Sequence, residues 1–84
     1  MQVLEIPVNT DLPHSKAEFE LFGQSFIFQF EFLEKENYRV LHIYDSEEKP
    51  LALGIRLITK WALFRHKNIE LIMLNDSLLA YEII

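Results

Sequence analysis

The chain has 84 residues, of which half are apolar and a quarter charged, with no cysteine and a formal net charge of −5. This length allows one domain, and the composition is that of a globular protein rather than a disordered one. The lack of cysteine excludes a disulfide framework, a thiolate zinc site and a cysteine nucleophile, and the acidic balance argues against a general nucleic-acid binder.

The N-terminal segment Met1–Val8 alternates apolar and polar residues and is expected to form a first strand, followed by a loop around Pro13. It has neither the basic start nor the apolar run of a secretory signal. No window of the sequence approaches the ~18–20 apolar residues of a membrane span. We therefore expect a soluble protein made in a cytoplasm, without membrane contact.

A period of two dominates the next part of the chain. Every even-numbered residue from Phe26 to Phe32 is a phenylalanine. Because alternate residues of a strand face opposite sides, these rings are predicted to lie on one face of a sheet. Segments 17–22 and 25–34 are predicted to form a β-hairpin, with Gly23 in its turn.

Two further strands are predicted in the middle of the chain. Tyr38–Tyr44 has apolar residues on both faces, which is typical of a central strand. After a polar loop, Leu51–Ile58 forms the next strand, with Gly54 marking a bulge or a close backbone approach. Its residues expected to face inward are Leu51, Leu53, Ile55 and Leu57.

The C-terminal third is less regular. Trp61, Phe64 and Arg65 are spaced i, i+3 and i+4, which predicts one short helical turn near 59–66. Segments 68–74 and 78–84 return to strand patterns. Together the elements predict a single, mainly β domain over 1–84, with an N-terminal strand and loop at 1–16. The meander at 17–84 is antiparallel and either closes into a small barrel or folds into a sandwich.

The sequence shows no catalytic or metal-binding pattern. His14, His42 and His66 lie far apart, and His42 is interpreted as a hydrogen-bonded structural imidazole. The carboxylates fall on polar strand faces and in loops, and the two glycines cannot form a phosphate-binding loop. We expect no enzyme activity, no catalytic residues, no metal and no cofactor.

Basic residues are concentrated in one segment of this acidic chain. Residues 51–67 hold half of the eight basic residues and no acidic residue. Aromatic residues with arginine are typical of protein interfaces, which predicts a partner-binding surface. The residues assigned to it are Arg56, Lys60, Trp61, Phe64 and Arg65. The same composition fits a ring plug at the end of a barrel, or a single-stranded nucleic-acid site. The apolar tail 78–84 is a second candidate docking strand.

The order of several short motifs resembles a known family. These motifs are Ile6-Pro7-Val8, Leu21-Phe22-Gly23-Gln24, the strand from Tyr38 to Asp45, Lys49-Pro50-Leu51, Gly54-Ile55-Arg56-Leu57-Ile58 and Leu63-Phe64. The succession, over roughly residues 6–74, is similar to the phage baseplate plug proteins first named from a cyanophage with a contractile tail.

This resemblance implies a small, non-enzymatic structural subunit of a phage or prophage tail baseplate. It would dock between larger tail proteins near the centre, where tube and hub meet, and it would carry no cofactor. Its location would be the cytoplasm of the bacterial host and then the virion, and it could form a homo-oligomer. The alternatives are a small β-barrel module that binds single-stranded nucleic acid or a small ligand, and a protein inhibitor or regulator.

Overall fold

The computed structural model describes residues 3–8, 12–58, 61–74 and 77–83, with only the backbone of Trp61. Within these ranges the regular structure consists of β-strands, and there is no helix. The strands are β1 (Val3–Ile6), β2 (His14–Leu21), β3 (Gln24–Leu33), β4 (Tyr38–Asp45), β5 (Pro50–Arg56), β6 (Trp61–His66), β7 (Ile69–Leu74) and β8 (Ser77–Glu82). The mainly β prediction is therefore confirmed, and β2 begins earlier than predicted.

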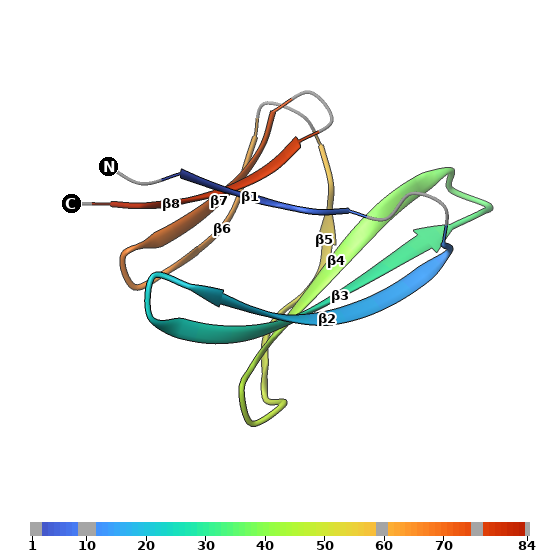
Figure 1. The fold of residues 1–84 in the computed structure, drawn as a ribbon. Coiled ribbons are helices and arrows are strands. Elements are labelled where there is room, and N and C mark those ends of the chain that lie inside the picture. Colours follow the sequence, from blue (N-terminus) through green and yellow to red (C-terminus); the bar gives the residue numbers. More distant parts are fainter. Residues whose placement is uncertain (1–2, 9–11, 59–60, 75–76, 84) are drawn as a thin grey trace.

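The strands form two antiparallel four-stranded sheets that face each other (Figure 1). One sheet has the order β2-β3-β4-β5 and is a simple meander. The other has the order β1-β8-β7-β6, so the N-terminal strand pairs with the last strand of the chain. β4 lies between β3 and β5, as its apolar residues on both faces predicted.

The described strands do not close into a barrel, and the architecture is that of a sandwich. Closure would require ladders between the edge strands of the two sheets, and irregular backbone lies at two of those edges. β5 shifts register against β4 on both sides of Ile43, and Gly54 in β5 has a φ of 71°. β6 shifts register against β7 between Ala62 and Phe64. Such bulges bend a strand and interrupt pairing.

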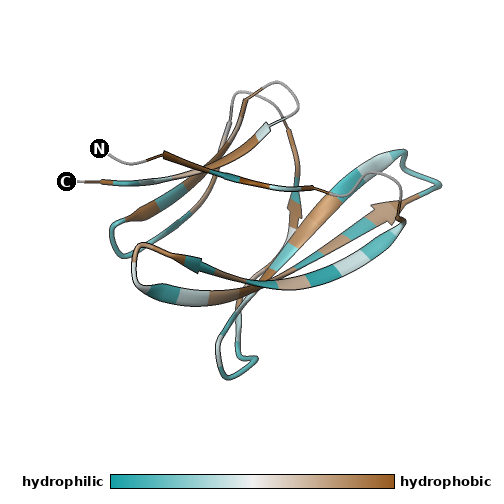
Figure 2. Cartoon of the chain, viewed as in Figure 1, coloured by the Kyte–Doolittle hydropathy of each residue, from teal (hydrophilic) through white to brown (hydrophobic). Residues whose placement is uncertain are grey.

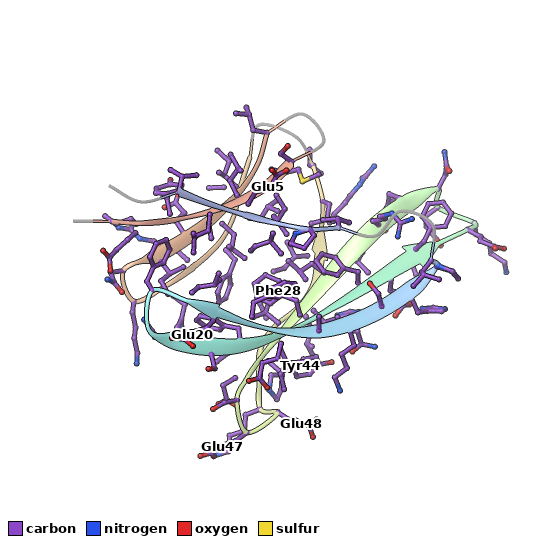
Figure 3. The ribbon with its side chains drawn as sticks, in the orientation of Figure 1. Glu5, Glu20, Phe28, Tyr44, Glu47 and Glu48 are labelled. Carbon is purple, nitrogen blue, oxygen red and sulfur yellow. The ribbon has the colours of Figure 1, made fainter. Side chains whose placement is uncertain are left out.

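The core lies between the two sheets, where the apolar side of each strand faces the other sheet. Figure 2 shows the alternation of hydrophobic and hydrophilic residues along the strands. The fully buried side chains of greatest volume are Phe28, Leu41, Ile43, Ile69, Leu71 and Leu78. In Figure 3 Phe28 points into the space between the sheets, whereas Tyr44 lies on the other side of its sheet. The prediction that the even-numbered rings of β3 share one face is confirmed by Phe26, Phe28 and Phe30, which are all buried.

The predicted helical turn near 59–66 is wrong where the structure describes it, because residues 61–66 form β6. The register shift between Ala62 and Phe64 places an extra residue in this strand, so its apolar residues do not follow a strict period of two. The prediction that Leu53 faces inward is also wrong. Leu53 is 60% exposed, since the bulge at Gly54 changes the alternation along β5.

The hypothesis of a free C-terminal docking strand is wrong as well. β8 pairs with β1 on one side and with β7 on the other. Its Leu78 and Ala80 are completely buried. The backbone groups and the apolar face of this strand are therefore satisfied inside the domain, and a partner cannot add to it.

Candidate partner-binding surface

The residues that the sequence assigned to partner binding are divided between the two sheets. Arg56 is the last residue of β5 and is exposed. Lys60 lies outside the described residues, and of Trp61 only the backbone is described, paired with Met73 of β7. Arg65 is exposed on β6 and pairs with Glu70. The structure therefore does not bring Arg56 and Arg65 together on one strand face.

Phe64 contacts residues of its own domain. It is half-buried and packs against the core, and its ring stacks on that of His66 with 6.0 Å between the centroids. The His66 ring also meets the edge of Phe26, at 5.9 Å. This arrangement agrees with the alternative in which Phe64 is a structural ring that packs at the edge of the core and does not bind a partner.

Arg56 lies over an aromatic ring. Its guanidinium carbon is 4.2 Å from the centroid of Tyr38, a cation–π contact. The register between β4 and β5 brings these residues close, because Arg56 pairs with Val40, two residues after Tyr38 on the same face. Arg56 is held against the sheet with its charge exposed, and arginine is one of the residue types enriched at interface hot spots.

A pocket of about 560 Å³ lies at the same end of the sandwich. It is lined by Val8, Phe32, Asn37, Tyr38, Arg39, Leu57 and Met73. Val8 follows β1, Phe32 lies near the end of β3, and Leu57 directly follows Arg56. The pocket therefore opens beside Arg56, the first of the residues that the sequence assigned to partner binding, and both sheets contribute to its wall.

Arg39 supplies a charged group to this mainly apolar pocket. Its guanidinium lies 5.3 Å from the ring centroid of Phe32 and donates a hydrogen bond to the backbone oxygen of Leu12 at 3.2 Å. Its own carbonyl oxygen accepts a hydrogen bond from the backbone nitrogen of Leu57 at 3.0 Å. These contacts join the start of β4 to the segments on either side of it and fix the shape of the pocket.

Sequence reasoning missed Arg39 and the part of the pocket contributed by β3 and β4. Arg39 lies in a stretch with six acidic residues and was counted only as part of that charge balance. The signal that could have found it is the strand alternation, because Arg39 has the same parity as Leu41 and Ile43. A charged residue on the apolar face of a strand marks an end of the core or a functional position.

His42 has hydrogen-bonding and charged partners within its own sheet. His42 accepts a hydrogen bond at Nδ1 from the backbone nitrogen of Gly54, at 2.9 Å, which confirms the interpretation of a hydrogen-bonded imidazole. Its Nε2 lies 3.7 Å from the carboxylate of Glu31. Among the described residues, no group of three or more histidine, aspartate or glutamate side chains is arranged to hold a metal ion.

The outer face of the β1-β8-β7-β6 sheet carries a tyrosine–carboxylate pair. The hydroxyl of Tyr81 donates a hydrogen bond to Glu70 Oε1. This hydrogen bond, with smaller contributions from burial and from the negative charge of Glu70, raises the pKa of Tyr81 above its ordinary value of 10.0. The positive charge of Arg65 opposes the shift. The pair links two neighbouring strands and involves no cleft.

The described part of the chain contains no helix with the length and apolar character needed to cross a membrane. A family model described as the plug gp18 of the cyanophage Pam3 baseplate matches residues 3–82. The chain belongs to this family. No curated protein and no solved structure matches the chain.

Membership of the baseplate plug family makes this chain a structural protein of a phage tail. Its location is the tail of the virion, in association with other baseplate proteins. The resemblance inferred from the turn at Gly23 and the stretch 54–58 is confirmed, and the match extends beyond residues 6–74 in both directions. The pocket and Arg56 therefore belong to a structural protein of a phage baseplate.

Proposed function

We propose that this plug protein is a non-enzymatic subunit that docks between larger tail proteins near the centre of the baseplate, where tube and hub meet. The observation that carries the proposal is the family match over residues 3–82, nearly the whole chain. The sandwich agrees with such a role. Its described side chains include no buried polar or charged residue, and the pocket at its end is mainly apolar.

The docking surface we propose consists of the end pocket together with Arg56 and the start of β6. An apolar side chain of a partner would enter between Leu57 and Met73, and Arg56 beside Tyr38 would pair with a carboxylate at the rim. A small pocket with an arginine at its rim is a typical anchor site, since such positions carry a large share of binding energy. Trp61 is included in the proposed docking surface because it is the first residue of β6.

The test is co-assembly with the tail-tube and hub proteins of the same phage. A double variant, Arg56→Glu with Trp61→Ala, should weaken co-purification with those proteins while far-UV circular dichroism stays unchanged. Lys49→Glu is the matched control, because it makes the same charge change in an exposed loop distant from the pocket. Equal binding by the double variant and the control would contradict the proposed surface, and so would loss of folding in the double variant, which would assign Trp61 to the core instead.

Binding of single-stranded nucleic acid is the alternative function. The separation of Arg56 and Arg65 onto different sheets argues against it, because a nucleic-acid site needs a continuous basic track. A gel shift with single-stranded DNA at ~50 mM salt distinguishes the two functions. A shift that disappears at higher salt would support the alternative, and we expect none.

A further inference from the structure

β2 is the most regular edge strand of the molecule. It pairs residue by residue with β3 over its eight residues, without a register shift. The other edge strands are each interrupted or short: β5 and β6 contain register shifts, and β1 has four residues and is followed by Pro7. On the other side of β2 no described strand is paired (Figure 1). A long, regular edge of this kind is a template for a further strand.

The hairpin geometry determines which backbone groups of β2 face the open edge. Phe22 and Gly23, with φ of 52° and 81°, form a two-residue turn between Leu21 and Gln24. At the other end of the ladder the nitrogen of Phe32 donates to the oxygen of Pro13, at 2.8 Å. Since hydrogen-bonded pairs alternate along an antiparallel ladder, the odd-numbered residues of β2 bond to β3. The residues that direct N–H and C=O outward are His14, Lys16, Glu18 and Glu20.

The same four residues carry a charge pattern that is complementary to itself. Their side chains lie on the outer face, and all four are exposed. His14 and the positively charged Lys16 occupy the first half of the strand, and the acidic residues, Glu18 and Glu20, the second half. In an antiparallel pair of β2 strands, Lys16 and the His14 imidazole would therefore lie opposite carboxylates.

A twofold axis through Ala17 satisfies both the hydrogen bonds and the charges. It places Lys16 opposite Glu18 of the second copy and His14 opposite Glu20, in pairs whose backbone groups all point toward each other. Ala17, small and exposed, lies opposite its own copy. A shift of the axis to Glu18 would instead place two carboxylates directly opposite each other, which is destabilising.

We propose that this protein forms a symmetric dimer in which β2 pairs with β2 of a second copy, antiparallel and centred on Ala17, so that the two β2-β3-β4-β5 sheets become continuous. The interface is isologous, as twofold dimers require, because each half of the strand meets the other half. The proposal does not depend on the docking surface at the end pocket, since β2 does not line that pocket.

Lys16 also has contacts within its own chain. Its Nζ lies 3.6 Å from Glu48 Oε1 and 6.0 Å from the ring centroid of Tyr44. The side chains of Lys16 and Glu48 are both mostly exposed, at 54% and 70%, so this ion pair is weak. Glu48→Gln removes the internal partner of Lys16 without changing a residue of β2, and it serves as a control.

The test begins with charge reversals on the edge, measured by sedimentation equilibrium of the full chain. Lys16→Glu and Glu18→Lys each convert two attractive pairs of the dimer into repulsive ones, so each should raise the dissociation constant about tenfold or more. Lys49→Glu, with the same charge change as Lys16→Glu but in the β4–β5 loop, should leave it unchanged, as should Glu48→Gln.

Mixing the two variants gives the sharper result. In a heterodimer of Lys16→Glu with Glu18→Lys every central pair is again of opposite charge. The mixture should therefore dimerise at concentrations where each variant alone is monomeric. The double variant with both changes exchanges the charges within one strand and should restore the homodimer.

Hydrogen exchange locates the contact on the edge. The amides of Lys16, Glu18 and Glu20 should become protected as concentration rises, whereas those of Ala17 and Phe19 should be protected at all concentrations. A protein that stays monomeric at every concentration would overturn the proposal. A dimer whose dissociation constant is unchanged by the charge reversals would overturn it equally. So would a dimer that protects other amides, because it would form through another face.

Discussion

The Phe28 ring is at the centre of the sandwich, and its removal should destabilise the fold strongly. The residue is 1% exposed, and its ring lies 5.4 Å from Phe19, 6.4 Å from Phe26 and 6.3 Å from Phe30, centroid to centroid. Truncation of a buried phenylalanine to alanine costs about 3–5 kcal/mol from lost burial and the cavity left behind. Because three ring contacts are lost as well, we expect the upper half of that range.

This cost is large for so short a chain. At about 0.05–0.15 kcal/mol per residue, 84 residues give a free energy of unfolding of about 4–13 kcal/mol. Phe28→Ala could thus unfold the protein, and Phe28→Leu, which keeps most of the volume, should cost only about 1–2 kcal/mol. Phe32→Ala is the matched control on the same strand, since Phe32 is only half-buried, and should cost about 1–2 kcal/mol.

The assay is urea unfolding followed by circular dichroism. The change in the free energy of unfolding is calculated with the same m-value, the dependence of that free energy on urea concentration, for all variants. The expected order of cost is Phe28→Ala first, with Phe28→Leu and Phe32→Ala well below it. If Phe32→Ala destabilises the protein as much as Phe28→Ala, the core does not lie between the two sheets at Phe28, and the reasoning fails.

Three further outcomes are expected from the same unfolding assay or from titration. Gly23→Ala should cost about 1–2 kcal/mol, because φ is 81° there, and Gly23→Asn should cost less, since asparagine tolerates this conformation; equal costs would contradict the turn. Leu53→Ser should change stability by less than about 0.5 kcal/mol, whereas Leu41→Ala, at a completely buried site, should cost about 2–5 kcal/mol. The phenol of Tyr81 should titrate above 10.0 in ultraviolet absorbance, and Glu70→Gln should bring its pKa down. Because the folded-state pKa is the raised one, the stability from this pair is complete below pH 10.0 and is lost as pH rises through the folded pKa; a stability unaffected by Glu70→Gln at every pH would refute it.

Much of the fold could be predicted from local pattern. The alternation from Phe26 to Phe32 identified β3 and its buried face, and Gly23 identified the hairpin turn. The two-sided apolar pattern of β4 placed it inside a sheet. These predictions succeed because a strand has a period of two and a tight turn needs positive φ, and both are properties of neighbouring residues.

The candidate site was only half predictable. Arg56 was singled out from composition, but its contact with Tyr38 depends on the register between β4 and β5, which bulges around Gly54 alter. The pocket joins Val8, Phe32, Leu57 and Met73, which come from distant parts of the chain. No spacing in the sequence relates such residues, because their distances are set by the packing of two sheets.

By itself the sequence determined that this chain is a small, cysteine-free β protein with alternating strands, and its motifs identified its family. Only the tertiary structure decided that the strands form a sandwich and not a barrel, that β8 is enclosed between β1 and β7, and that β2 is left as the regular open edge. The physical reason is that side-chain alternation is written locally, whereas the pairing of strand edges depends on bulges and on which distant strand arrives beside them.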